Sequence, residues 1–97
     1  MGNIDNYHWD DDKSELTKAE HGVGLDEACK LIFYDEKTHW KVFENDNYPN
    51  QYRVITKTKK GFLTLAMEDI SDEYGEFIKL ISCWNSSPKE KGKLKND

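Results

Sequence analysis

The sequence predicts an α+β fold in which two N-terminal helices pack on a small antiparallel β-sheet, followed by a mobile C-terminal tail. Two consecutive segments with helical spacing lie in the first third of the 97-residue chain, and most of the segments with strand character follow them. A chain of this length forms a single domain, residues 1–97. We place its core at about residues 7–84 and its polar tail at 85–97.

The chain is expected to open with a loose leader, residues 1–6, and a short strand, Tyr7–Trp9. The first helix is predicted over about Asp12–His21. A carboxylate cap, Asp10 or Asp11, satisfies its free backbone N–H groups, and Gly22 supplies a left-handed stop.

The two helices differ in how they meet the core. Along the first, Leu16 and Ala19 are the expected buried positions. The second shows one apolar face at positions i, i+3, i+4 and i+7, formed by Leu25, Ala28, Cys29 and Ile32. The two helices are therefore joined by a tight corner that contains Gly22 and Gly24.

Four further strands are predicted, at Thr38–Phe43, Tyr52–Thr58, Phe62–Met67 and Glu76–Cys83. The second and third are separated only by Lys59-Lys60-Gly61, which is typical of a hairpin turn. The acidic segment between the last two strands is predicted to be a loop. Together with the first strand, the order is β-α-α followed by a β meander.

Charge is unevenly distributed along the chain. Residues 1–50 carry 12 acids and 5 lysines, a balance of −7, while residues 51–97 carry 9 bases and 7 acids, a balance of +2. An acidic protein is repelled by phosphate backbones, which argues against non-specific nucleic-acid binding by the whole surface. A local basic face on the second half remains possible.

Cysteine and histidine spacing favours no metal or redox motif. Cys29 and Cys83 are expected to be reduced, buried thiols. His8, His21 and His39 share no ligand spacing. The run Asp10-Asp11-Asp12 is better explained as a helix cap than as a magnesium site. We therefore expect no metal and no other cofactor.

Lysines and one arginine supply the remaining candidate groups. Arg53 shares one side of its predicted strand with Lys57, and Lys59-Lys60 is most simply a solvated turn. Lys79 is flanked by apolar residues, so it either extends from an outer sheet face into solvent or projects into a functional groove. His21, at a helix C-terminus, is favoured by the helix dipole.

Several of these residues together resemble the start of the BrnT family, small bacterial type II toxins similar to RelE-type ribonucleases. They are Trp9-Asp10, Lys13, His21-Gly22-Val23, Asp26-Glu27-Ala28 and Leu31-Ile32-Phe33. The later strands also resemble the family's last two strands, and Lys89-Glu90 resembles its C-terminal basic-acidic pair. The resemblance covers about residues 7–91.

The resemblance implies a metal-independent RNA endonuclease that inhibits translation and is neutralised by a cognate antitoxin. Attack of the ribose 2′-OH on phosphate needs a proton acceptor, a proton donor and cations. When the family's roles are assigned to this chain by position, the resemblance implies that His21 is the acid or base. It implies that Lys13, Arg53 and Lys79 bind or stabilise phosphate. An ungapped alignment places Tyr52, one residue before Arg53, at the family's arginine.

Departures from the family pattern favour an alternative. Thr17 replaces an asparagine, Glu20 a lysine and Trp84 an arginine. Each swap removes a polar partner or a cation. The alternative is a non-catalytic acidic binding or inhibitor module on the same fold that engages a basic protein partner. A subunit of a DNA-binding toxin–antitoxin complex is a third possibility.

RNA, the ribosome, an antitoxin or a basic protein surface are thus the expected partners. We expect no membrane partner, because the chain shows no signal peptide and no apolar run near 18 residues. The expected location is the cytoplasm.

Overall fold

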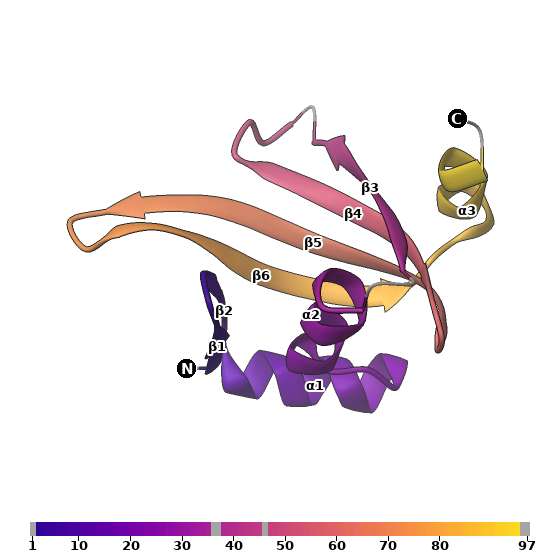
Figure 1. Cartoon of the computed structure of the whole chain (residues 1–97), viewed down its shortest axis with the longest axis horizontal. Helices are drawn as coiled ribbons and strands as arrows, with labels where there is room; N and C mark the ends of the chain where they lie inside the picture. The colour runs from indigo at the N-terminus through magenta and orange to yellow at the C-terminus, as the bar shows by residue number, and fades with distance from the viewer. Residues whose placement is uncertain (1, 36–37, 46, 96–97) are drawn as a thin grey trace.

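The computed structural model describes residues 2–35, 38–45 and 47–95. Its centre is a six-stranded sheet in the order β1-β2-β6-β5-β4-β3 (Figure 1). The strands are β1 (Gly2–Ile4), β2 (Tyr7–Trp9), β3 (His39–Glu44), β4 (Gln51–Thr58), β5 (Gly61–Asp72) and β6 (Gly75–Asn85). The helices are α1 (Asp11–His21), α2 (Leu25–Phe33) and α3 (Pro88–Lys95).

The predicted fold class is wrong in its sheet and in its chain order. Strands β3 to β6 form the expected antiparallel meander, but β2 lies parallel to β6, so the sheet is mixed. Two strands, β1 and β2, precede the first helix. Hydrophobic alternation reveals that a strand exists but not which distant strand it pairs with, and between β2 and β6 the chain forms both helices and strands β3 to β5.

The expected loose leader is also wrong. Gly2–Ile4 pairs antiparallel with Tyr7–Trp9, and the turn between them uses a left-handed residue, Asp5, at φ 50°. Aspartate tolerates this conformation better than most residues. Residue 1 lies outside the described residues.

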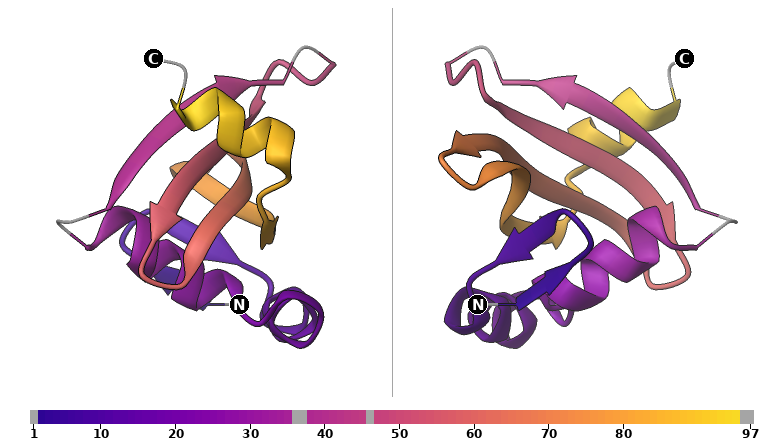
Figure 2. Two further views of the ribbon diagram at one scale, coloured as in Figure 1. Left: turned by 90° about the vertical axis from the view of Figure 1, so that its right-hand side faces the viewer. Right: turned by 60° about the vertical axis from the view of Figure 1, so that its left-hand side comes forward.

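Helices α1 and α2 cover one face of the sheet, called the inner face below (Figures 1 and 2). The four apolar positions predicted for α2 are all buried there. They pack with Trp9 and with Val54, Leu63, Leu65, Met67, Leu80 and Cys83 from the strands. Both cysteines are buried and free, as predicted.

Helix α1 begins and ends where the sequence predicts, to within one residue. The Asp10 carboxylate accepts a hydrogen bond from Lys13 N at 3.0 Å, and Gly22 closes the helix at φ 84°. The prediction that Leu16 is buried is wrong, because its side chain is 50% exposed, and Ala19 is exposed too. The helix instead buries Ser14 and Thr17.

Ser14 fixes the corner between the two helices. Its hydroxyl accepts a hydrogen bond from Leu25 N at 2.9 Å, and donates one to Asp26 Oδ1 at 3.3 Å. The first helix therefore packs through a narrow polar stripe, which an apolar pattern does not reveal.

The predicted mobile tail contains a third helix. Ser87 and Glu90 form a capping box, in which Glu90 N donates to Ser87 Oγ at 3.2 Å and Ser87 N donates to Glu90 Oε1 at 2.9 Å. Pro88 occupies the first helical position, where its missing N–H costs nothing. Residues 96–97 lie outside the described residues.

Strands β5 and β6 run well beyond the predicted bounds. The acidic segment expected to be a loop continues the ladder as far as Asp72 and Gly75, so the two strands form a long hairpin that projects from the body (Figure 1). None of the helices in the described part of the chain combines the length and apolar character of a membrane span.

Candidate functional site

The face of the sheet opposite α1 and α2, called the outer face below, carries two of the four predicted site residues, Arg53 and Lys79. Strand register assigns it, because residues that pair across strands share a face. Tyr7 and Trp9 pack against the inner core, so His8 between them belongs to the outer face. The His8 ring stacks on the Phe77 ring, with ring centroids 4.5 Å apart, which is consistent with this assignment of His8 to the outer face.

One polar row crosses four strands of the outer face. His8 of β2 pairs with Lys79 of β6, Lys79 pairs with Glu68 of β5, and Glu68 pairs with Gln51 of β4. The Gln51 amide donates to Glu68 Oε2 at 2.8 Å. Lys79 is exposed and the other three are half-buried, so the row is accessible to solvent.

A second row lies beside the first and contains Arg53. It runs Phe43, Arg53, Ala66 and Ser82 across β3, β4, β5 and β6. Arg53 is exposed, and its guanidinium lies 5.6 Å from the centre of the Trp84 ring. Arg53 lies two strands away from Lys79 and two residues farther along the strand direction. The distance between their Cα atoms is therefore roughly 12 Å.

Helix α3 covers one end of the outer face, next to the second row, on the other side of the sheet from α1 and α2 (Figure 2). Ile55 and Thr64 are fully buried at this end, and Thr64 Oγ1 lies 2.8 Å from Ser86 Oγ. The ammonium groups of Lys91 and Lys93 lie over the rings of Phe62 and Phe43. The helix thus forms one wall of the open part of the face.

Trp84 and Glu90 hold this wall. Trp84 Nε1 donates to Glu90 Oε1 at 3.1 Å. Burial opposes ionisation of Glu90, but the hydrogen bonds from the Ser87 backbone, the Trp84 indole and the Ser87 and Thr64 hydroxyls lower its pKa overall. A hollow of about 190 Å³ lies between this helix and β3, bordered by residues that include Arg53, Glu90 and Lys93.

The four site residues predicted from sequence do not meet in one groove. Arg53 and Lys79 share the outer face. Lys13 and Lys79 border another hollow, about 430 Å³, between the start of α1 and β6. His21 ends α1, eight residues beyond Lys13 and so about 12 Å along the axis, with its Nε2 3.7 Å from Glu20 Oε2.

Two of the three positions at which the chain departs from the BrnT pattern, Thr17 and Trp84, have structural roles. Thr17 is buried, and its hydroxyl donates to Lys13 O at 2.8 Å. Trp84 stacks with Arg53 and donates a hydrogen bond to Glu90 of α3. Tyr52 faces inward and donates to Asp69 Oδ1 at 2.9 Å; burial and that bond raise its pKa. Arg53 rather than Tyr52 therefore reaches the outer face.

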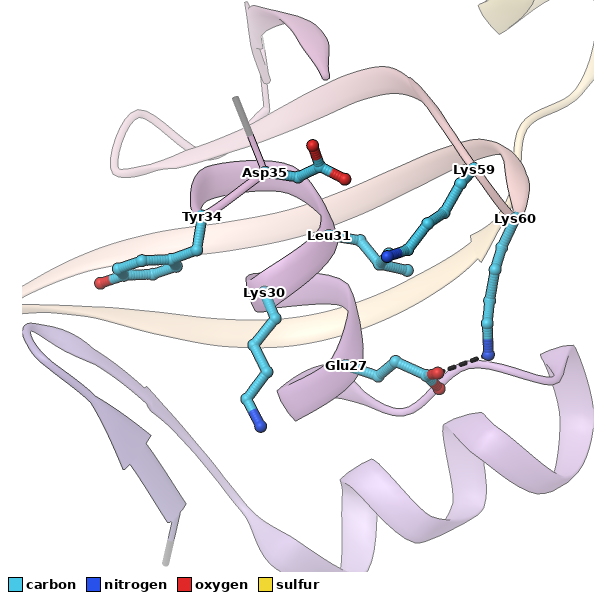
Figure 3. Close-up of a pocket in the computed structure, with 7 residues that line it drawn as sticks. All are labelled: Glu27, Lys30, Leu31, Tyr34, Asp35, Lys59 and Lys60. Carbon is cyan, nitrogen blue, oxygen red and sulfur yellow. Dashed lines mark hydrogen bonds and ion pairs between the residues drawn. The ribbon is translucent and has the colours of Figure 1, made fainter. Parts of the chain in front are cut away.

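A wider hollow, about 740 Å³, lies between α2 and the turn joining β4 to β5 (Figure 3). Lys60 forms an ion pair with Glu27 across it, which neutralises one wall. Lys59 extends over Leu31, while the Tyr34 hydroxyl points away and donates to Asp5. Glu27 and Lys60 offset each other's charge in this hollow, and we assign the hollow no chemistry.

Charge separates the two faces. Along α1 and α2 the described residues include six acids and three lysines, the acids being Asp11, Asp12, Glu15, Glu20, Asp26 and Glu27. The outer face carries Lys41, Arg53, Lys57 and Lys79 against Glu68 and, at the hairpin end, Asp72. The local basic face that the charge distribution left possible is present.

The outer face therefore combines cations, aromatic rings, the imidazoles of His8 and His39, and a carboxylate. Cations bind phosphate, rings stack on bases, and the imidazoles and the carboxylate can exchange protons. Sequence reasoning missed the contributions of His8 and Glu68. Strand alternation does place the His8 side chain on the other face from Tyr7 and Trp9. It does not show that His8 lies beside Lys79, because Lys79 is distant in sequence. Within the described residues, no group of three His, Cys, Asp or Glu side chains is placed to hold a metal ion.

No protein-family model matches the chain, and a search of curated proteins finds no match.

Proposed function

We propose that the chain binds single-stranded RNA across its outer face and cleaves it without a metal ion, as a toxin of the BrnT kind paired with an antitoxin. The observation that supports this most is the shared position of Arg53 and Lys79 on one open sheet face. Their long side chains can both reach a phosphate that lies between them. Trp84 and Phe77 border the same area and offer ring faces for bases.

The chemistry is transesterification within the RNA chain. The ribose 2′-oxygen attacks the adjacent phosphorus as it loses its proton, and the bond from phosphorus to the 5′-oxygen breaks. The products are a 2′,3′-cyclic phosphate and a 5′-hydroxyl. Arg53 and Lys79 stabilise the negative charge that develops on the phosphoryl oxygens, a contribution of about 10²–10³ in rate for one preorganised donor.

Induced expression in a bacterial host tests this proposal. We expect wild type to arrest growth with loss of mRNA, and the double variant Arg53→Ala/Lys79→Ala to relieve both effects. The matched control is Lys18→Ala/Lys30→Ala, which removes the same charge from exposed positions in the helical layer and should arrest growth like wild type. Abundant, folded wild-type protein without arrest or RNA loss would contradict nuclease activity.

The second candidate, a binding module for a basic protein, is favoured by the acidic character of α1. Its first turn carries Asp11 and Asp12, and Glu15 and Glu20 are exposed farther along. Such a surface attracts a basic partner and repels RNA. A pull-down from host extract would compare wild type with Asp12→Lys/Glu15→Lys. A basic protein that wild type captures and the variant does not would support the binding module.

A further inference from the structure

We infer that His8, and not His21, is the catalytic acid–base residue of the outer face. This rests on the proposed RNA cleavage and names the residue that moves the proton. His8 is the only histidine in β1, β2 or β6, and it lies in the same cross-strand row as Lys79 and Glu68. Adjacent strands are about 4.8 Å apart, so the imidazole lies next to the Lys79 side chain.

The surroundings of His8 fix its ring in one orientation. The ring stacks on Phe77 at an interplanar angle of 22°, and its residue is half-buried between β1 and β6. A catalytic base benefits from such support, because a fixed ring loses little freedom when substrate binds. His21, in contrast, lies at the C-terminus of α1 on the helical side of the molecule, beside Glu20.

The step balances with RNA alone as the reactant. The 2′-hydroxyl gives its proton to the neutral imidazole of His8 as its oxygen bonds to phosphorus, and the departing 5′-oxygen takes a proton from water. The imidazolium then returns its proton to solvent. Lys79 supplies positive charge beside the phosphate, and the Glu68 carboxylate, which accepts a hydrogen bond from the Gln51 amide, lies opposite Lys79 in the same cross-strand row.

Cleavage of a short single-stranded RNA by purified His8→Phe tests this, because phenylalanine keeps the stacking on Phe77 but carries no proton. The controls are His21→Ala and His39→Phe. We expect His8→Phe to lower the cleavage rate by about 10²–10⁴ and to bind a 2′-O-methyl oligonucleotide with unchanged affinity. Both controls should cleave like wild type. A His8→Phe rate within about threefold of wild type, or loss of cleavage in His21→Ala, would overturn the assignment.

Ring resonances of the three histidines separate failure of this inference from failure of the proposed function. Titration of wild type with the 2′-O-methyl oligonucleotide should shift the His8 ring signals more than those of His21 and His39. RNA binding without such a shift would contradict the role of His8, but it would still be consistent with RNA binding to the outer face. Absence of RNA binding would contradict the proposed function itself and remove the role of His8 with it. Thermal unfolding of His8→Phe, compared with wild type, reports whether the variant is folded.

Discussion

The indole nitrogen of Trp84 donates a hydrogen bond to Glu90 Oε1 across 3.1 Å, so the last strand directly holds the helix that follows it. The same carboxylate oxygen accepts from Ser87 N, which begins that helix. Helix α3 therefore has a fixed place at one end of the outer face. Because Trp84 also stacks with Arg53, the helix and the proposed phosphate-binding side chain are linked through one ring.

The pH dependence of stability should report the Glu90 interactions. Its pKa in the folded protein lies below the ordinary value of 4.5, so its ionised form contributes stability above pH 4.5 that is lost as the pH falls through the folded pKa. We expect Glu90→Gln to lower the free energy of unfolding near neutral pH and to match wild type under more acidic conditions. Urea unfolding at both pH values measures this. An equal difference at both would mean that the charge of Glu90 contributes nothing.

Ser14→Ala should destabilise the corner between α1 and α2. The substitution leaves the buried Leu25 N–H without its acceptor, which costs about 1–3 kcal/mol. Chemical denaturation gives the difference in unfolding free energy. Ser71→Ala, at an exposed position of the long hairpin, is the matched control and should change stability by less than about 0.5 kcal/mol. Equal effects of the two substitutions would contradict the role of the Ser14 hydroxyl.

Both thiols should be inert in the folded protein. Burial raises the pKa of Cys83 to about 12, and burial together with nearby carboxylates raises the pKa of Cys29 to about 12. Since the thiolate is the reactive form, neither should react with a thiol reagent at neutral pH. Two thiols should react in denaturant. Rapid labelling of the native protein at either site would show that this part of the core opens readily.

The sequence predicts the elements of this fold better than their arrangement. Local signals located α1 to within one residue and identified the buried face of α2, because Asp10, Gly22 and the apolar spacing act within one or two helical turns. The parallel contact between β2 and β6 could not be predicted this way, because His8 and Lys79 are 71 residues apart and strand alternation carries no information about partners. The third helix was missed although Ser87, Pro88 and Glu90 form a recognisable helix start.

The candidate site, like the fold, could be predicted from the sequence only in part. Arg53 and Lys79 were predicted from strand alternation and from the resemblance, and the register places both on the outer face. Lys13 and His21 belong to α1, and the helix separates them along its axis because residues near one end of a helix do not approach the other. Residue type alone could not select among three histidines. Only the pairing of β2 identifies His8 as the one in the polar row.

Binding of single-stranded RNA to the outer face is the central claim, and the salt dependence of affinity tests it most directly. Fluorescence anisotropy with a labelled 2′-O-methyl oligonucleotide would compare wild type, Arg53→Gln/Lys79→Gln and the equally charged control Lys18→Gln/Lys30→Gln. Loss of two phosphate contacts should weaken binding and reduce the slope of log affinity against log salt by about 1.4 in the first variant alone. Identical affinities and slopes for the two variants would contradict an RNA-binding outer face.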